Sequence, residues 1–115
     1  MPKKALARRL AAPIKLSPFP EGQKQSKHHI QVVIETTRGG RNKLAYDEEL
    51  GIFRLKKVLP EGMSFPYDFG FVPSTKGDDG DPLDVLVLMD QPGTTGCLET
   101  GKKGAEMWDE DAADD

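Results

Sequence analysis

The 115-residue sequence predicts a small, mainly β or α+β domain, and three observations support that class. Short runs of β-branched and aromatic residues alternate with clusters of Gly, Pro, Asn and Asp, as strands alternate with turns. No long stretch repeats apolar residues at the helical period of 3.6. The only cysteine, Cys97, cannot close a disulfide within the chain, so the fold must depend on its apolar core.

Five segments have the strand pattern: residues 29–37, 42–46, 52–58, 65–71 and 83–89. The acidic, glycine-closed connection over 47–51 suits a hairpin, so we expect the first three strands to form a meander. In the fourth segment aromatic residues occupy every second position, which places four rings on one face. The fifth has no evident partner further along the chain.

Charge divides the chain into three parts, although the formal net charge is only -3. The first 30 residues contain seven Lys or Arg and one acidic residue, whereas the last 17 contain seven acidic residues and two lysines. We expect residues 1–29 to be a basic flexible arm, 30–98 the folded domain and 99–115 an acidic disordered tail. A transit peptide is the alternative for the arm, and a short helix near 105–108 is the most that the tail could contribute.

Several classes of protein are excluded or disfavoured. The longest apolar run, residues 85–89, is far shorter than the roughly 20 residues that cross a bilayer, so no membrane partner is expected. One cysteine favours a reducing, cytoplasmic setting. A nucleic-acid binder with an aromatic face and a basic arm is a further hypothesis, but an acidic segment beside that face would repel a phosphate backbone.

Residues 78–84 contain four carboxylates immediately before an apolar strand. Such carboxylates repel one another unless a cation neutralises them, and their hard oxygen atoms favour Mg²⁺ or Mn²⁺. Gly80 allows a tight turn and Pro82 stiffens it, so that Asp79 and Asp84 can point to one place. The spacing does not fit a calcium-binding EF-hand loop, because Leu83 stands at its fifth position. A solvated turn is the alternative, and the loop alone favours neither.

Residues 79–85, Asp-Gly-Asp-Pro-Leu-Asp-Val, resemble the signature of the soluble family I inorganic pyrophosphatases at every position. The resemblance spans residues 30–98 without a gap, through residues 32–35, 41–43, 46–53 and 65–73. It implies an OB-like five-stranded β-barrel, incomplete here at the C-terminus. It also implies a homo-oligomer that uses Mg²⁺, or Mn²⁺ as a substitute, to hydrolyse inorganic pyrophosphate to two phosphates.

The resemblance also assigns roles to the acidic residues. Asp79 and Asp84 correspond to metal ligands, and Asp84 would bridge two ions. Asp81 corresponds to the catalytic base that takes a proton from the attacking water. Glu35 corresponds to a residue of the metal site that organises metal-bound water.

The resemblance assigns substrate binding to two lysines. Lys43 corresponds to a phosphate-binding lysine of the family, and Lys57 stands where the family usually has a phosphate-binding arginine, so the bidentate fork is lost. Phe65 and Phe69 replace tyrosines, and Ala45 replaces a frequent acidic residue. The neighbouring Lys56 is expected to lie on a solvated strand face.

Beyond Leu98 the resemblance ends, whereas the family continues with further strands and a second pair of metal-ligand aspartates. Asp109 and Asp114 have the spacing of that pair, but we expect this to be an accident because no apolar strand precedes them. We therefore expect a C-terminally truncated member, for which a frameshifted gene is one origin. Two functions stay open: an inorganic diphosphatase, or a non-catalytic remnant that binds metal or phosphate.

Overall fold

The computed structural model describes residues 13–20, 28–75, 82–104 and 106–109. Within them lie one 3₁₀ turn and seven strands. These are η1 (Pro13–Lys15), β1 (His29–Thr36), β2 (Asn42–Asp47), β3 (Ile52–Val58), β4 (Asp68–Val72), β5 (Leu83–Val87), β6 (Leu98–Lys102) and β7 (Met107–Asp109). No helix in these ranges is long and apolar enough to span a membrane.

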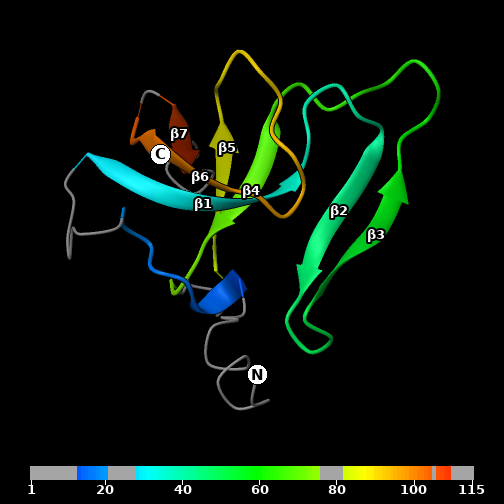
Figure 1. Cartoon of the computed structure of the whole chain (residues 1–115). Helices are drawn as coiled ribbons and strands as arrows, with labels where there is room; N and C mark the ends of the chain where they lie inside the picture. Colours follow the sequence, from blue (N-terminus) through cyan, green and yellow to red (C-terminus); the bar gives the residue numbers. More distant parts are fainter. Residues whose placement is uncertain (1–12, 21–27, 76–81, 105, 110–115) are drawn as a thin grey trace, which may run out of the picture.

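Five strands form one antiparallel sheet in the order β6-β1-β4-β5-β7, and β2 pairs with β3 in a separate hairpin. In Figure 1 the strand β1 crosses the middle of the molecule, and the hairpin extends to the right of it. The predicted mainly β class is confirmed. In the described ranges the sheet ends at β6 and β7, so it is a barrel that does not close.

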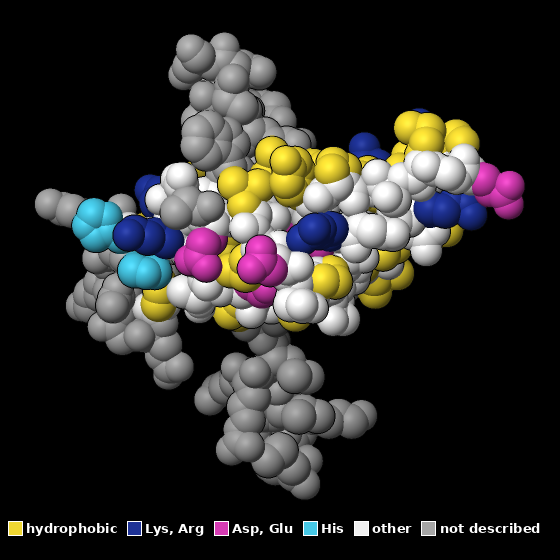
Figure 2. Space-filling model, turned by 90° about the horizontal axis from the view of Figure 1, so that it is seen from above, with side chains coloured by type: hydrophobic (Ala, Val, Ile, Leu, Met, Phe, Trp, Pro, Cys, Tyr) yellow, Lys and Arg dark blue, Asp and Glu magenta, His cyan; other side chains and the backbone are white. Residues whose placement is uncertain are grey.

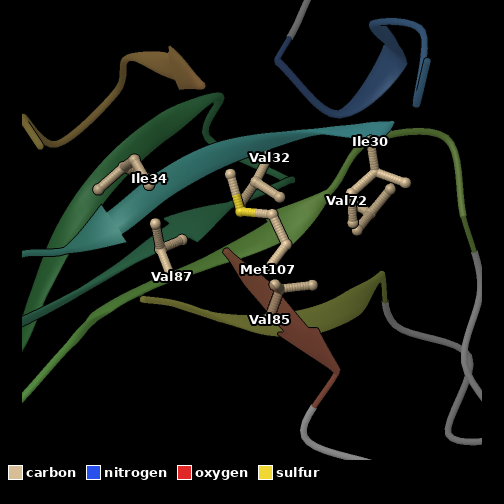
Figure 3. Close-up of a cluster of buried hydrophobic side chains, with 7 residues drawn as sticks. All are labelled: Ile30, Val32, Ile34, Val72, Val85, Val87 and Met107. Carbon is tan, nitrogen blue, oxygen red and sulfur yellow. The ribbon is translucent and has the colours of Figure 1, made fainter. Parts of the chain in front are cut away.

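The core consists of apolar side chains that alternate along the strands and point to one face of the sheet. Figure 3 shows their convergence, with side chains from β1, β4, β5 and β7. The members are Ile30, Val32, Ile34, Val72, Val85, Val87 and Met107, all nearly inaccessible to solvent. Burial of this apolar surface is the main favourable contribution to folding.

The segment after Leu98 is part of the sheet. Strand β6 pairs with β1, from Leu98 opposite Val33 to Lys102 opposite His29, and β7 pairs with β5. Met107 explains this order, because its side chain completes the core and Gly101 leaves the space that it fills. The expectation of a disordered tail is therefore wrong for the described residues up to 109, and the helix expected near 105–108 is replaced by a strand. Residues 110–115 lie outside the described ranges.

The predicted three-stranded meander is also wrong. Strand β1 pairs with β4 and β6 rather than with β2, and β7 is the partner of β5 that the sequence did not reveal. The Thr36 side chain links β1 to the hairpin, because its hydroxyl donates to the Leu44 carbonyl at 2.9 Å and accepts from the Leu44 N–H at 3.0 Å. The hairpin is thus tied to the sheet at the end of β1.

Part of the predicted basic arm packs against the sheet. The Gln31 N–H donates to the Pro18 carbonyl at 2.8 Å, and the Ser74 N–H donates to the Ile14 carbonyl at 2.8 Å. The expectation of a flexible arm is therefore wrong for residues 13–20. Residues 1–12 and 21–27 lie outside the described ranges.

The four aromatic residues of the fourth predicted strand do not form one row. The chain bends at Pro66 and Tyr67, so β4 starts only at Asp68. Phe71 packs against Tyr46 of the hairpin with ring centroids 5.7 Å apart, and Phe65 meets Phe69 edge-on at 5.7 Å. The rings therefore pack in two separate contacts at the junction of the sheet and the hairpin.

The hairpin leaves several large hydrophobic side chains exposed. Leu50, Ile52, Leu55 and Val58 have between 49% and 61% of their surface accessible. Figure 2 shows hydrophobic side chains gathered at the end of the molecule where the hairpin lies, on the right as in Figure 1. The hairpin therefore contributes little to the core.

A buried carboxylate organises the loops at one end of the sheet. Asp68, 2% exposed, accepts hydrogen bonds from the Arg38 N–H at 2.6 Å and from the Gly93 N–H at 2.7 Å. Glu99 approaches the same glycine, and its buried Oε2 atom has no hydrogen-bond partner among the described residues. Burial, and then the negative charge of Asp68, raises the pKa of Glu99.

We predict that Glu99→Gln stabilises the chain at neutral pH. Because folding raises the pKa of Glu99, the wild-type free energy of unfolding falls as the pH rises from the unfolded-state pKa through the folded-state pKa. An uncharged amide has no such loss. Urea unfolding between pH 4 and pH 8 measures it, with Glu106→Gln as the control for loss of one charge. A wild-type stability that does not decrease over this range more than that of Glu99→Gln would contradict the prediction.

We also predict that Gly70→Ala destabilises the fold by about 1 to 3 kcal/mol, the usual cost of overpacking. A Cβ atom at Gly70 would overlap the Val33 carbonyl oxygen and lie 2.7 Å from Cγ1 of Val32, so β1 and β4 would have to move apart. At Gly40 the nearest atom lies 3.3 Å from the added Cβ, and Gly40→Ala should cost less. Chemical denaturation compares the two variants, and equal losses would refute this steric explanation.

Candidate functional site

Two carboxylates predicted to act at a metal site, Glu35 on β1 and Asp84 on β5, come together at the junction of the sheet and the hairpin. Both line the same two clefts. Burial raises the pKa of Glu35 to about 7; the Tyr46 N–H opposes this rise, the negative charge of Asp84 adds to it, and Lys43 lowers it. The effect of Asp84 on Glu35 indicates that the two carboxylates are electrostatically coupled.

The first cleft has a volume of about 450 Å³ and lies between the sheet and the tip of the hairpin. Its lining is strongly acidic, because Glu35 and Asp84 are joined by Asp47, Glu48 and Glu49 of the turn between β2 and β3. The remaining lining residues are Ile14, Tyr46, Lys56, Phe71 and Pro82. A cleft of this composition can hold cations directly, and it can hold an anion only together with them.

The second cleft, of about 330 Å³, shares Glu35 and Asp84 with the first. Lys43 supplies its positive charge, and Phe65 and Phe69 form an apolar wall. The other lining residues are Thr36, Leu44, Ala45 and Gly70. The carboxylate pair therefore stands between an acidic cleft and a smaller one that contains a lysine.

Backbone contacts hold Glu35 in place. The Tyr46 N–H donates to Glu35 Oε2 at 2.7 Å, and the Thr95 hydroxyl donates to the Glu35 carbonyl at 2.9 Å. The Tyr46 ring packs between Phe53 and Phe71, with centroid distances of 5.2 and 5.7 Å. Because both the strand and the hairpin are tied at this point, the carboxylate is positioned before any ligand binds.

The chemistry of these donors fits a hard divalent cation. The Glu35–Asp84 pair offers carboxylate oxygens to a cleft, and a cation placed there would offset their mutual repulsion. Within the described ranges no group of three or more acidic, His or Cys side chains forms a complete metal cluster. Two further predicted residues, Asp79 and Asp81, belong to the segment 76–81 outside those ranges.

The residues at the two ends of that segment are hydrogen-bonded to each other. The Leu83 N–H donates to Thr75 Oγ1 at 3.1 Å, and the same hydroxyl donates to the Val72 carbonyl at 2.6 Å. Asp84 follows Leu83 directly in β5. The segment with Asp79 and Asp81 thus leaves and rejoins the sheet next to a residue of the candidate site.

The structure separates the lysines that the sequence grouped together. Lys43 lines the second cleft. Lys57 lies directly opposite Lys43 in the hairpin, is exposed and lines neither of these clefts. Lys56 is exposed, as expected, and it also lines the first cleft.

The sequence analysis expected no strand before Asp109, and the structure corrects this point. A strand does precede it: β7 starts at the buried Met107 and ends at Asp109, whose partner across the ladder is Val85, the neighbour of Asp84. Asp114 lies outside the described ranges.

Curated relatives resemble about two thirds of the chain. It is 47% identical over 73 residues to the inorganic pyrophosphatase of Synechocystis, a stretch of 64% of this chain and 43% of the relative. It is 47% identical over 77 residues to that of Thermus thermophilus, 67% of this chain and 43% of the relative. The chain thus spans roughly two fifths of the length of these relatives.

Solved structures agree with these relatives. The crystal structure of inorganic pyrophosphatase from Thermus thermophilus superposes with a TM-score of 0.70 at 32% identity, covering 86% of this chain and 60% of the other. That from Ehrlichia chaffeensis gives a TM-score of 0.67 at 30% identity, with 76% and 54% covered. The predicted OB-like, pyrophosphatase-type fold is consistent with these likenesses.

The model of the inorganic pyrophosphatase family matches residues 32–115. The match starts on β1, includes the carboxylate pair and the segment 79–85, and continues past Leu98, where the sequence reasoning expected the likeness to end. On the extent of this match, the chain belongs to the inorganic pyrophosphatase family.

Proposed function

We propose that this chain hydrolyses inorganic pyrophosphate to two phosphates with the help of Mg²⁺. The main support is the Glu35–Asp84 carboxylate pair, which stands between two clefts that each contain a lysine. Pyrophosphate has two anionic phosphoryl groups, so a site for it needs carboxylates that hold divalent cations and side chains that bind phosphate directly. Both kinds of residue meet here.

In this proposal Asp79, Asp84 and Glu35 hold the metal. Bound Mg²⁺ neutralises phosphoryl oxygens and makes water more acidic. Mn²⁺, which has a similar preference for oxygen ligands, is expected to substitute.

The remaining roles belong to one acid and the hairpin lysines. Asp81 accepts a proton as water adds to one phosphoryl group; the bond from that phosphorus to the bridging oxygen breaks, and the second phosphate leaves. Lys43 orients the substrate from the second cleft. Lys57, which lies opposite Lys43 in the hairpin, is retained from the family likeness as a second substrate-binding residue.

A second candidate function is metal and phosphate binding without turnover. The wall of the second cleft favours it, because Phe65 and Phe69 have no hydroxyl group and Ala45 has no carboxylate to offer to a ligand. Under this alternative the carboxylate pair still binds metal, but hydrolysis is absent.

Location and assembly follow the same proposal. We place the protein in the cytoplasm and propose a homo-oligomer, which the exposed hydrophobic side chains of the hairpin support. The acidic first cleft again disfavours nucleic acid as a partner.

We predict Mg²⁺-dependent release of phosphate from pyrophosphate, and loss of at least about 100-fold of it in Asp81→Asn, in line with removal of a general base. A colorimetric phosphate assay on the full chain measures both. Asp90→Asn is the matched control, because Asp90 is an exposed aspartate on the loop after β5 and lines neither cleft. If Asp81→Asn hydrolyses pyrophosphate like the wild type, Asp81 is not the base.

Both candidate functions require metal binding, so a measurement of metal affinity distinguishes them from a chain that binds no metal. We expect Glu35→Gln to weaken Mn²⁺ binding by about 10- to 100-fold, as loss of a residue that supports a metal site does, and Asp84→Asn to weaken it at least as much. Electron paramagnetic resonance of free Mn²⁺ during titration gives the affinity. Glu61→Gln, an exposed acidic residue outside both clefts, should bind like the wild type. Equal affinities in all four proteins would remove the metal site from the proposal.

A further inference from the structure

A separate cavity of about 320 Å³ lies on the core face of the sheet, and we refer to it as the core-face cavity. Leu83 and Val85 of β5 line it, whereas Asp84 between them lines the two clefts of the candidate site. Successive side chains of a strand point to opposite faces of a sheet. The core-face cavity and the candidate site therefore lie on opposite sides of β5.

Apolar side chains form most of the wall of the core-face cavity. Four members of the core, Ile30, Val72, Val85 and Met107, line it, and Figure 3 shows them on four different strands. Protein interiors leave few voids larger than a water molecule, and a larger apolar cavity can bind an apolar molecule. The volume and the apolar lining are typical of pockets that hold small-molecule ligands.

Hydrogen bonds hold two parts of the wall in place. One part contains Pro18, whose carbonyl accepts from the Gln31 N–H of β1 at 2.8 Å. The other part contains Lys103, in the turn between β6 and β7, whose N–H donates to the His28 carbonyl at 2.7 Å. Because both parts are tied to the segment at and before β1, the cavity is formed before any ligand binds.

The polar side chains of the wall indicate the kind of ligand. Among the described residues that line the cavity, Lys103 is the charged one and Thr75 is the one with a hydroxyl group. The Thr75 hydroxyl already donates to the Val72 carbonyl and accepts from the Leu83 N–H. The exposed Lys103 is thus the side chain that can meet an anionic group of a ligand. An apolar wall with a single exposed cation suits a molecule with a hydrocarbon chain and one carboxylate.

We infer that the core-face cavity binds a medium-chain fatty acid, with the hydrocarbon chain against the core residues and the carboxylate next to Lys103. Removal of the chain from water supplies most of the affinity, and the ammonium group favours a carboxylate over a neutral head group. This binding does not depend on pyrophosphate hydrolysis, because the cavity shares no lining residue with either cleft.

Calorimetric titration of the full chain with octanoate and with octanol tests the role of charge. We expect the wild type to bind octanoate more tightly than octanol. Lys103→Met should weaken octanoate binding about threefold to fivefold, in keeping with loss of an exposed charge pair, and leave octanol binding unchanged. The matched control is Lys102→Met, because this neighbouring exposed lysine of β6 does not line the cavity. Equal affinity of the wild type for octanoate and octanol would overturn the assignment of a fatty acid.

A second variant tests the location of the ligand. Phe19→Ala removes an aromatic side chain from the wall and should weaken the binding of both ligands by at least about fivefold. Tyr67→Ala, which removes an exposed aromatic side chain outside the cavity, should bind both ligands like the wild type. If Phe19→Ala binds octanoate as tightly as the wild type, or if the wild type binds neither ligand, the inference is wrong. None of these measurements involves phosphate release, so their outcome is independent of the proposed function.

Discussion

The structure depends on the alternation of side chains along β1. Ile30, Val32 and Ile34 occupy one face and enter the core. The ladder to β4 shifts register between Ile34 and Thr36, and Glu35, which lies at this irregularity, lines the clefts. A shift of the strand by one residue would expose three large apolar side chains and bury the carboxylate in their place. The β6 and β4 ladders fix β1 from both sides up to Ile34, so the strand that assembles the core also carries the carboxylate that follows. Stability and chemistry therefore share one strand.

The site is electrostatically unfavourable on its own. Glu35 is half-buried next to Asp84, and its raised pKa measures the cost of ionising it there. Neutral side chains would cost less free energy to bury at this position. A pair of carboxylates is therefore consistent with a site that binds a cation from outside the chain. The hairpin meets this need in part, since the Tyr46 N–H and Lys43 both favour the ionised carboxylate.

The sequence predicted much of the fold because period-two alternation is a local signal. It gave the bounds of β3 and nearly those of β1 and β5. It did not reveal β6 and β7, because their residues are mostly polar or charged, and pairing depends on Met107 filling a space above Gly101 that only the folded sheet creates. The motif around Asp84 is a local signal as well, whereas Glu35 was chosen through the family resemblance. The β-bulge at Lys56 could not be predicted, because a bulge is a mismatch between two paired strands that neither strand shows alone.

The placement of Met107 has a consequence for synthesis on the ribosome. A chain that has emerged only as far as β5 still lacks the side chain that fills the core between β1 and β5, and the edge of β5 has no partner. Both edges of β1 are paired only after β6, about 70 residues later in the chain, has been synthesised. Nascent chains are therefore exposed to edge-to-edge association until translation passes residue 109, and this vulnerability belongs to the order of synthesis rather than to the finished fold.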